Sequence, residues 1–371
     1  MCNKPIRILQ VIGSLEAGGS QSMIMNIYRN INRNEIQFDF VIDHTGENFY
    51  ENEIRNLGGK IYIMPTYKVY NHFFVKRAWY IFFKAHPEYK ILHSHVRSYA
   101  VVYIDIAKKF GIKTIIHSHS TSNGTGIKSA IKKLLQYPLR THADYLLACS
   151  NNAGEWLYGK KACNQDNFFV IPNAVDIPKY KFNADTRSKY RKELGIENRY
   201  VIGHIGRFHQ AKNHLFLLDV FKKIYERNKN AVLLLIGDGE LRQQIEERIS
   251  ELQLDDCVIL TGNRNDVANL FQAMDIFVFP SLWEGLPVTV VEAQAAGLPC
   301  IISDKITDEV NLSKLVVKLA PVDPEKWCDE LLKKHKHIDA SAEISKAGFD
   351  IKTSASELCA LYKNIGRFAY E

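Results

Sequence analysis

Short apolar runs alternate with amphipathic stretches along the first half of the chain. Polar, Gly or Pro residues bound each run, as is typical of buried strands, whereas apolar residues recurring with the period of a helix predict helices. This alternation predicts a parallel sheet with helices on both faces. The expected strands are 6–12, 38–43, 60–64, 91–95 and 113–117, the expected helices are 21–30, 51–57 and 100–110, and apolar runs at 145–150 and 168–171 close this half.

A second series of the same kind follows a turn-rich connector at 172–178. We therefore predict an α/β protein of two Rossmann-like domains that face each other, residues 1–177 and residues 178–354. The closing stretch 354–370 is expected to form a helix that could pack on either domain. The strands expected in the second half are 201–205, 232–236, 258–260, 276–279 and 300–303, and the helices are 215–227, 240–252 and 267–273.

The stretch 279–299 joins a strand to a helix through a loop with two nearby carboxylates. We expect Pro287 in the first helical turn and Gly297 at the helix end. Glu284 then falls in the loop and Glu292 inside the helix. Ligands of open α/β sheets bind at the carboxyl ends of strands, where helix N-termini offer free N–H groups. The pair is a candidate site, although a glutamate early in a helix can simply stabilise the helix dipole.

Composition narrows the class of protein. The chain has 371 residues, 46% hydrophobic and 24% charged, which fits an ordinary globular protein of two domains. Its seven cysteines are scattered and never spaced as CxxC, which argues for a reducing cytoplasm and against a disulfide framework or a zinc site. Charge interrupts the first apolar run, so we expect no signal peptide. No apolar run approaches the roughly 20 residues of a membrane span, so we expect a cytoplasmic or peripherally attached protein.

Three glycine turns follow strands of the second half and carry charged residues. Gly206 and Arg207 come directly after the first strand, and Lys212 follows. An arginine can bind two phosphate oxygens and a lysine adds a point charge, which suits a diphosphate, although a surface cation is more often just solvated. The other two turns contain Asp238 after the second strand, and Gly262 with Arg264 after the third. Such loops at one sheet edge predict a nucleotide site.

Polar groups also end the strands of the first half. A glycine-rich turn with Gly18, Gly19 and Ser20 follows the first strand and lets backbone N–H groups approach a phosphate. Two HxH pairs, 93–95 and 117–119, end two other strands. They invite a metal hypothesis, but no carboxylate or cysteine accompanies them at ligand spacing and the chain contains no DxD. A hydrogen bond from a histidine to a sugar hydroxyl fits better, so we expect no metal and no cofactor.

These motifs together resemble retaining glycosyltransferases of family 4, which have a GT-B fold. The resemblance covers nearly the whole chain and rests on the Gly18–Gly19 pair, Gly206 with Arg207 and Lys212, the 237–239 turn, and the block from Pro280 to Glu292. It implies acceptor binding by the N-terminal domain, sugar-nucleotide binding by the C-terminal domain, an active site in the cleft between them, and a terminal helix, 355–371, that crosses back to the first domain.

The resemblance also implies roles for particular residues. His119, Glu284, Arg207 and Lys212 would be catalytic, with Glu292 on the ribose hydroxyls, Glu284 on the donor sugar, and His119 on a hydroxyl of the transferred sugar. Two departures are Gln21, where the family often has glutamate, and Ala174, where its linker often has glycine. The implied donor-binding residues are Gly19, Gly206, Arg207, Lys212, Asp238, Gly262, Arg264, Ser281, Glu284, Gly285, Leu286, Pro287 and Glu292, and the implied acceptor-binding residues are Gly18, Ser20, His95, Arg97, His117, Lys132 and Lys133.

Sugar transfer from a diphosphate needs no metal if protein groups stabilise the leaving phosphate. Negative charge develops on that phosphate, and Arg207, Lys212 and the helix N-terminus near Leu286 can stabilise it. For retention, the acceptor hydroxyl attacks on the face that the phosphate leaves, and the phosphate takes its proton. We expect both glutamates to bind neutral hydroxyls as ionised carboxylates rather than to act as acid and base.

The basic first half indicates an anionic partner. Residues 1–178 carry a net charge of +8 and the remainder −1. The segments 67–86 and 127–140 mix aromatic or aliphatic residues with Lys and Arg. They are either core-facing helices or a face that rests on an anionic membrane to reach a lipid-diphosphate-linked glycan acceptor.

Three other functions stay open at this point. One is a nucleotide-sugar epimerase of GT-B architecture, and another is a non-catalytic sugar-nucleotide-binding subunit of a partner. The third is nucleic-acid binding by the basic half, but no recognised stacking module is present, so we expect no nucleic acid among the partners.

Overall fold

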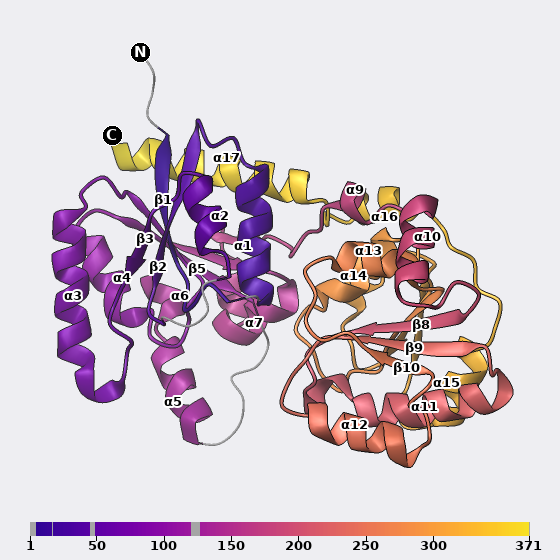
Figure 1. The fold of residues 1–371 in the computed structure, drawn as a ribbon. Coiled ribbons are helices and arrows are strands. Elements are labelled where there is room, and N and C mark those ends of the chain that lie inside the picture. The colour runs from indigo at the N-terminus through magenta and orange to yellow at the C-terminus, as the bar shows by residue number, and fades with distance from the viewer. Residues whose placement is uncertain (1–4, 17, 45–48, 120–126, 371) are drawn as a thin grey trace. The chain divides into compact units, whose positions relative to one another are not determined.

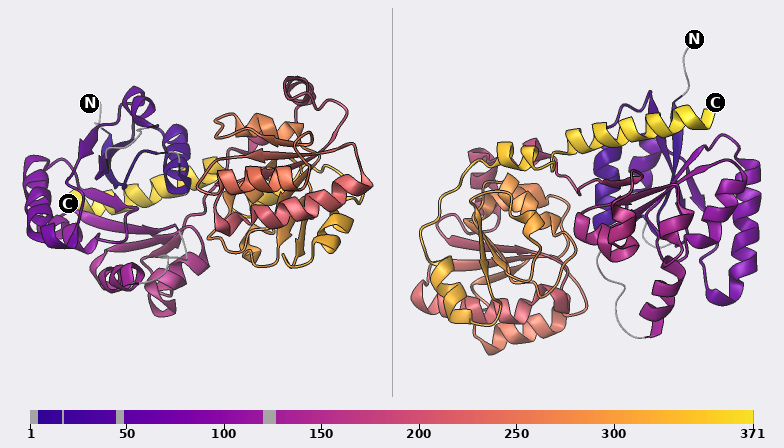
Figure 2. Two further views of the ribbon diagram at one scale, coloured as in Figure 1. Left: turned by 60° about the horizontal axis from the view of Figure 1, so that its bottom comes forward. Right: turned by 180° about the vertical axis from the view of Figure 1, so that it is seen from behind.

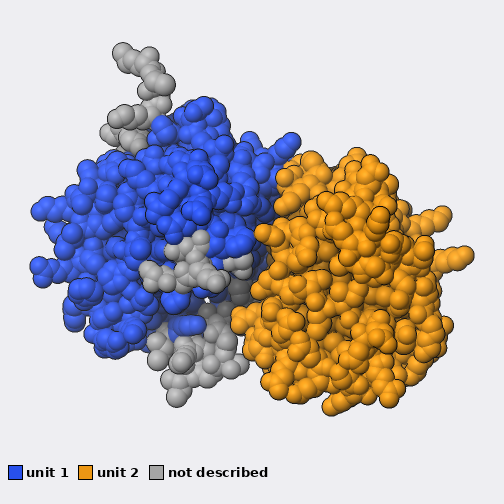
Figure 3. All heavy atoms as spheres, in the orientation of Figure 1, with its two compact units in different colours: residues 1–174, 351–371 blue, residues 175–350 orange. Residues whose placement is uncertain are grey.

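The computed structural model describes residues 5–16, 18–44, 49–119 and 127–370, without the side chains of 127–131 and 368–370. It divides into two compact units, residues 1–174 with 351–371, and residues 175–350 (Figure 3). The predicted boundaries, after 177 and after 354, lie a few residues from these junctions. The roles assigned to the two halves stay predictions.

Unit 1 is a seven-stranded parallel sheet covered by helices on both faces (Figure 1). The strand order is β3-β2-β1-β4-β5-β6-β7. Its strands are β1 (Ile6–Val11), β2 (Ile36–Ile42), β3 (Ile61–Ile63), β4 (Ile91–Ser94), β5 (Lys113–Ser118), β6 (Tyr145–Ala148) and β7 (Phe168–Val170). Its helices are α1 (Gly19–Asn30), α2 (Glu51–Asn56), η1 (Val69–Asn71), α3 (His72–Ala85), α4 (Val101–Lys109), α5 (Ile127–Gln136), α6 (Leu139–His142), α7 (Asn151–Tyr158), α8 (Lys160–Cys163) and α17 (Ile351–Tyr370).

Alternate residues of the central strands enter two separate cores. Ile8 of β1 packs in the core beneath α1 and α17, while its neighbour Leu9 packs in the core beneath α3 and α4. Strand residues with opposite side-chain directions are therefore both buried, which explains the continuous apolar runs. The register pairs Ile8 with Phe38 of β2 and with Ile91 of β4.

The C-terminal helix α17 belongs to unit 1 (Figure 1, Figure 2). It packs beside α1, and its apolar face, which includes Leu358, Tyr362 and Ile365, lies in the same core as β1 and β2. The predicted helix is thus confirmed, and it starts three residues earlier than the predicted 354, at Ile351.

Unit 2 is a six-stranded parallel sheet in the order β10-β9-β8-β11-β12-β13. The chain leaves β8 in one direction for β9 and β10 and returns to the other side of β8 with β11, so the topology switches between β8 and β11. The strands are β8 (Tyr200–Ile205), β9 (Ala231–Ile236), β10 (Val258–Leu260), β11 (Ile276–Phe279), β12 (Cys300–Ser303) and β13 (Val316–Leu319). The helices are α9 (Ile177–Tyr180), α10 (Ala184–Glu193), η2 (Gln210–Lys212), α11 (His214–Arg227), α12 (Arg242–Glu251), α13 (Val267–Ala273), α14 (Val288–Ala295), η3 (Asp308–Val310), α15 (Pro324–Leu331) and α16 (Ser341–Lys346).

The expected elements of both halves are present within a few residues, and β10, β11, β12 and α13 have the predicted bounds. Sequence reasoning missed several elements, including the helices α7 and α15 and two elements with little apolar periodicity. Helix α10 buries only Tyr190 and Arg191, and every residue of the edge strand β13 is partly buried. Among the described residues, none of the helices combines the length and the apolar character that a membrane crossing requires.

Candidate functional site

Apart from Gly19 in unit 1 and Glu292 inside helix α14, the predicted donor-binding residues lie on four neighbouring loops of unit 2. These loops follow β8, β9, β10 and β11, which are all parallel and adjacent in the sheet. All four loops therefore lie at the carboxyl edge of the sheet, and two of them flank the switch between β8 and β11, where α/β proteins bind ligands. The prediction that the glycine turns share one sheet edge is confirmed.

Close backbone contacts hold three of these loops together. Gly237 has φ +138°, and a Cβ at this position would lie 2.2 Å from the carbonyl oxygen of Gly206. A Cβ on Gly239 would lie 2.6 Å from the carbonyl oxygen of Phe208. The Gly237 N–H donates to the Gly262 carbonyl at 3.0 Å. Only glycine fits such contacts, so these residues let the backbones of the three loops approach one another closely.

Lys212 and Glu284 form an ion pair across the β8 and β11 loops. Lys212 Nζ lies 2.7 Å from Glu284 Oε1, and the two side chains are 17% and 16% exposed. The ammonium also lies 4.5 Å from the centre of the Phe279 ring. A Cβ on Gly206 would lie 3.0 Å from the Lys212 stem, so the glycine leaves room for this lysine. The structure thus brings together two predicted catalytic residues that are 72 positions apart.

The other charged residues of these loops are more exposed. Arg207 is 72% exposed and lies 3.2 Å from Glu240. Arg264 pairs with Asp266 at 2.5 Å and holds the pKa of that carboxyl at about 2. Asp238 accepts from the Gly239 N–H at 2.8 Å and pairs with Arg242 at 3.0 Å. All three charged residues therefore have partners within unit 2, and the pair that Arg207 forms with Glu240 is the most exposed, with side chains 72% and 47% exposed.

The loop from Ser281 to Pro287 leads into α14. The Leu282 N–H donates to the Ala211 carbonyl at 2.8 Å, which ties this loop to the β8 loop. Ser281 is fully buried, and its hydroxyl has no hydrogen-bond partner among the described residues. Leu286 is 8% exposed. The prediction of Pro287 in the first turn is off by one position, because Pro287 has extended backbone and caps the helix that begins at Val288. Gly285 lies in the same loop.

Glu292 lies inside α14 and has a tyrosine partner that the sequence did not indicate. The Tyr180 hydroxyl donates to Glu292 Oε1 at 2.6 Å. Burial raises the pKa of Glu292, while the hydrogen bond from Tyr180 lowers it. The side chain is partly buried, so one carboxylate oxygen is fixed by the protein while the group keeps further acceptor capacity.

In unit 1, the glycine turn after β1 leads directly into α1. Gly18 is the N-cap and Gly19 the first helical residue, followed by Ser20. A Cβ on Gly19 would meet no atom of the described residues within 4 Å. Gln21, which replaces the glutamate common in the family, donates to the Ser14 carbonyl and so folds back onto the turn.

Four histidines stack at the ends of β4 and β5. The ring centres of His95 and His119 are 5.0 Å apart, and those of His117 and His119 are 4.2 Å apart. His93 and His117 are fully buried, whereas His95 and His119 are partly buried. Burial, with a smaller contribution from Arg97, lowers the pKa of His119 to about 3. The rings are therefore neutral at pH 7.

The surroundings of His119 include Arg97 and Asn173. The Arg97 guanidinium lies 5.3 Å from the Trp156 ring. Asn173 acts on the pKa of His119 in the opposite direction from burial, but its Oδ1 and His119 Nδ1 are both outside hydrogen-bonding geometry with the residues that the structure describes. The neutral imidazole of His119, whose Nδ1 has no hydrogen-bond partner among the described residues, therefore lies near the Asn173 amide.

Three of the four histidines lie close enough together to be considered as metal ligands. Ligand atoms of His93, His95 and His117 lie within 4.8 Å of one another. Both ring nitrogens of His93 and of His95 are in hydrogen bonds. Binding a metal would require breaking those bonds, so the contacts fit a hydrogen-bonded cluster better.

Two of the predicted acceptor-binding residues lie on α5, and one of them, Lys133, lines a pocket together with Trp156. Lys132 and Lys133 are both exposed. The structure does not describe the side chains of residues 127–131, which belong to the same predicted basic segment. The segment 67–86 forms η1 and α3, and one face of α3 is buried through Val75, Trp79 and Phe83.

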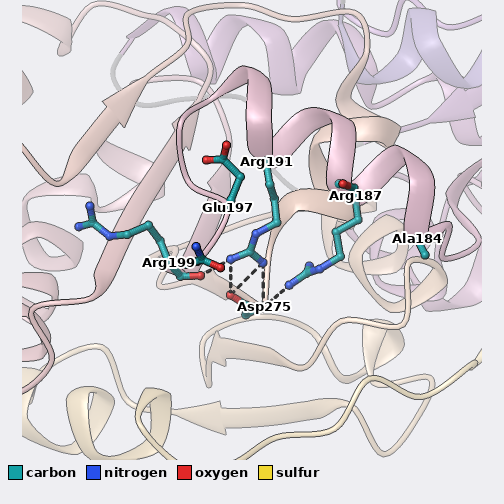
Figure 4. A pocket seen from close by; sticks show the side chains of 8 residues that line it. Ala184, Arg187, Arg191, Glu197, Arg199 and Asp275 are labelled. Atoms are coloured by element: carbon teal, nitrogen blue, oxygen red, sulfur yellow. Dashed lines mark hydrogen bonds and ion pairs between the residues drawn. The ribbon is translucent and has the colours of Figure 1, made fainter.

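A pocket lined by several arginines lies elsewhere in unit 2 (Figure 4). This pocket, of about 460 Å³, is lined by Arg187 and Arg191 of α10, which both pair with Asp275. Asp275 precedes β11 and accepts from the Val201 N–H at 2.7 Å. Asp275 therefore lies at the amino edge of the sheet, opposite the glycine loops, and Arg187 and Arg191 already neutralise its carboxylate. We assign this pocket a structural role.

The two α/β units and their glycine loops define the class of GT-B glycosyltransferases. The chain belongs to glycosyltransferase family 4: the model of Glycosyltransferase Family 4 matches residues 17–179, and the model of Glycosyl transferases group 1 matches residues 186–310. Over 369 residues the chain is 32% identical to the putative glycosyltransferase EpsF of Bacillus subtilis, with 96% of each chain covered. The predicted fold class, family and enzyme class are confirmed.

Two further relatives add detail. The UDP-Gal:alpha-D-GlcNAc-diphosphoundecaprenol alpha-1,3-galactosyltransferase of Escherichia coli is 30% identical over 228 residues, with 58% of each chain covered. The crystal structure of HepE from Anabaena in complex with UDP and glucose has a TM-score of 0.79 and 18% identity, and covers 96% of this chain and 99% of that chain. At this identity the structural likeness shows the fold alone.

Proposed function

We propose that this protein is a retaining, metal-independent glycosyltransferase that moves a sugar from a UDP-sugar to a lipid-diphosphate-linked glycan acceptor, in the synthesis of a cell-surface polysaccharide. The observation that carries the proposal is the partly buried Lys212–Glu284 ion pair at the carboxyl edge of unit 2. A preformed cation beside glycine-rich backbone is suited to a diphosphate. The UDP named in the HepE complex and the diphosphoundecaprenol in the E. coli relative's name support the donor and acceptor classes.

In this proposal the donor lies along the four loops of unit 2. Lys212 shifts from Glu284 to the diphosphate when the donor binds, and Arg207, whose side chain is 72% exposed, adds a second cation. Glu284 is then released to accept from a hydroxyl of the donor sugar. Glu292 accepts from the ribose hydroxyls. The acceptor hydroxyl attacks on the face that the phosphate leaves, so the sugar–phosphate bond breaks as the new glycosidic bond forms and the phosphate takes the proton.

A donor screen followed by a transfer assay tests this function. A ligand at about 100 times its Kd adds roughly 2.7 kcal/mol to stability, so UDP and the correct UDP-sugar are expected to raise the melting temperature. Transfer of radiolabelled sugar to lipid extract is then expected, with the anomeric configuration retained. Absence of both transfer and slow donor hydrolysis across all UDP-sugars would refute the proposal, and interconversion of the free donor without an acceptor would identify an epimerase.

We also propose that α3 rests on an anionic membrane. Its exposed face combines apolar Phe73 and Phe74, which are 84% and 63% exposed, with the exposed cations Lys76 and Arg77. Apolar side chains among basic ones are what an interfacial helix presents to anionic lipid. A peripheral position would bring the enzyme to a lipid-linked acceptor.

Vesicle flotation tests the membrane proposal. The double variant Phe73→Ser, Phe74→Ser is expected to lose binding to phosphatidylglycerol vesicles while binding UDP normally. The control is Phe182→Ser, which removes a phenylalanine of unit 2 that is 49% exposed. Equal binding by both variants would exclude α3 as the membrane contact.

A further inference from the structure

Six side chains of unit 1 form one continuous hydrogen-bonded chain that links the C-terminal helix to His119. The successive distances are 3.2, 2.6, 3.1, 2.9 and 2.7 Å. At the two ends, His117 Nε2 and His119 Nδ1 are buried atoms without a partner in the described part of the chain. In order, the members are His117, His93, Tyr362, Gln10, His95 and His119.

Gln10 determines the direction of the bonds toward His119. Its Nε2 donates to the Tyr362 hydroxyl, and its Oε1 accepts from His95 Nε2. A neutral imidazole has one donor nitrogen and one acceptor nitrogen. His95 therefore carries its proton on Nε2, and its bare Nδ1 accepts from His119 Nε2. This leaves His119 Nδ1 as a hydrogen-bond acceptor.

The same reasoning runs in the other direction from Tyr362. The tyrosine accepts from Gln10, so its own proton is donated to His93 Nδ1. His93 then carries its proton on Nε2 and donates it to His117 Nδ1. All four histidines consequently share one tautomer. Reversing the Gln10 amide would reverse every bond and move all four protons to Nδ1, so the rings change together or not at all.

Neutrality of the rings supports this chain. Burial, together with the neighbouring histidines, lowers the pKa of His93, His95 and His117 well below its ordinary value. The four rings therefore have no charge at neutral pH, which is the state that the tautomer argument requires.

We propose that Gln10 and Tyr362 are positioning residues that hold His119 in a single tautomer through this chain, so that its Nδ1 accepts from a hydroxyl of the donor sugar. The inference rests on the proposed function for the ligand. His119 is the only partly buried end of the chain, since His117 is fully buried. A bare nitrogen accepts from a hydroxyl and offers no donor to a carbonyl or carboxylate.

Nitrogen-15 NMR of the histidine-labelled full chain tests the tautomer without using activity. We expect His93, His95, His117 and His119 all to be neutral at pH 7 and to carry the proton on Nε2. In Tyr362→Phe the chain is broken in the middle, and we expect mixed tautomers. Protons on Nδ1, different tautomers among the four wild-type rings, or one equivalent of zinc held by them in the purified protein would overturn the proposal.

Tyr28→Phe is the matched control. Tyr28 and Tyr362 are both fully buried in unit 1, both pack on Phe38, and both use their hydroxyl in two hydrogen bonds. Tyr28 lies outside the chain, so Tyr28→Phe should reproduce any loss of stability and leave the four tautomers unchanged.

Donor binding provides the second readout. Relative to Tyr28→Phe, Tyr362→Phe is expected to bind the UDP-sugar about three- to tenfold more weakly and to bind UDP equally well, because UDP lacks the sugar hydroxyl. Equal UDP-sugar affinities of the two variants would overturn the role in binding. If the wild-type protein binds no UDP-sugar, the proposed function fails, while the NMR result still decides whether the chain sets the tautomer.

Discussion

Replacing Glu292 by glutamine tests the proposed ribose contact. The substitution keeps the shape of the side chain and its acceptor oxygen toward the Tyr180 hydroxyl, which lies 2.6 Å away. It removes the negative charge that a bound hydroxyl would meet. Binding should suffer while folding should not.

The magnitude follows from the environment of the carboxylate. A hydrogen bond to a charged group contributes about 1.5–3 kcal/mol, so loss of the charge is expected to raise the Kd of UDP by roughly 10- to 150-fold. Stability should change in the opposite direction. Burial raises the pKa of Glu292, so its ionised form is disfavoured in the folded state and this unfavourable contribution grows as pH rises through the folded pKa. Glu292→Gln should therefore be as stable as wild type, or more stable, at pH 7.

Calorimetric titration with UDP and thermal unfolding without ligand measure the two effects. Glu226→Gln is the control, since Glu226 is an exposed acid of the same unit on α11. Wild-type affinity in Glu292→Gln would refute the ribose contact. A loss of affinity accompanied by a large loss of stability would assign the residue to packing instead.

Further predictions concern the phosphate site, the loops, pH and metal. Lys212→Met should lower kcat/KM by about 10²- to 10³-fold, whereas Lys223→Met, on the exposed part of α11, should leave it unchanged in the same assay. Gly237→Ala should lower the free energy of unfolding in urea by about 1–3 kcal/mol, because the added Cβ meets the Gly206 carbonyl. The control Gly195→Ala, at a position with positive φ but no described atom within 4 Å of the added Cβ, should lower it less. Equal losses in the two variants would contradict the contact. Burial lowers the pKa of His119 to about 3, so below the ordinary histidine pKa of about 6.5 the unfolded state binds more protons than the folded state. The contribution of the neutral ring to folding stability is therefore complete above pH 6.5 and falls by about 2 kcal/mol at pH 5. An unchanged urea midpoint between about pH 7.5 and 5 would be inconsistent with a buried neutral ring. Sugar transfer should continue in excess EDTA, and its loss with recovery on adding Mg²⁺ would contradict the metal-independent mechanism.

The strands, loops and helices of unit 2 could be anticipated to different degrees. The strands were predictable because parallel strands covered on both faces need continuous apolar runs, as in β11 and β12. The loop positions followed, since every parallel strand ends at the same edge. Helix α10 was not predictable because its sequence has little apolar periodicity, and it is held by Arg187 and Arg191 on Asp275.

By itself, the sequence determined the alternation of strands and helices, the glycine turns and the residue types at the carboxyl edge, because these depend on local periodicity and backbone freedom. Only the tertiary structure decided which groups meet. Lys212 reaches Glu284 across 72 positions, and Gln10 reaches Tyr362 across 352. Such contacts depend on strand order and on the packing of α17 in unit 1, which no local pattern encodes. The partners of the site residues, and hence their protonation and orientation, therefore came from the fold.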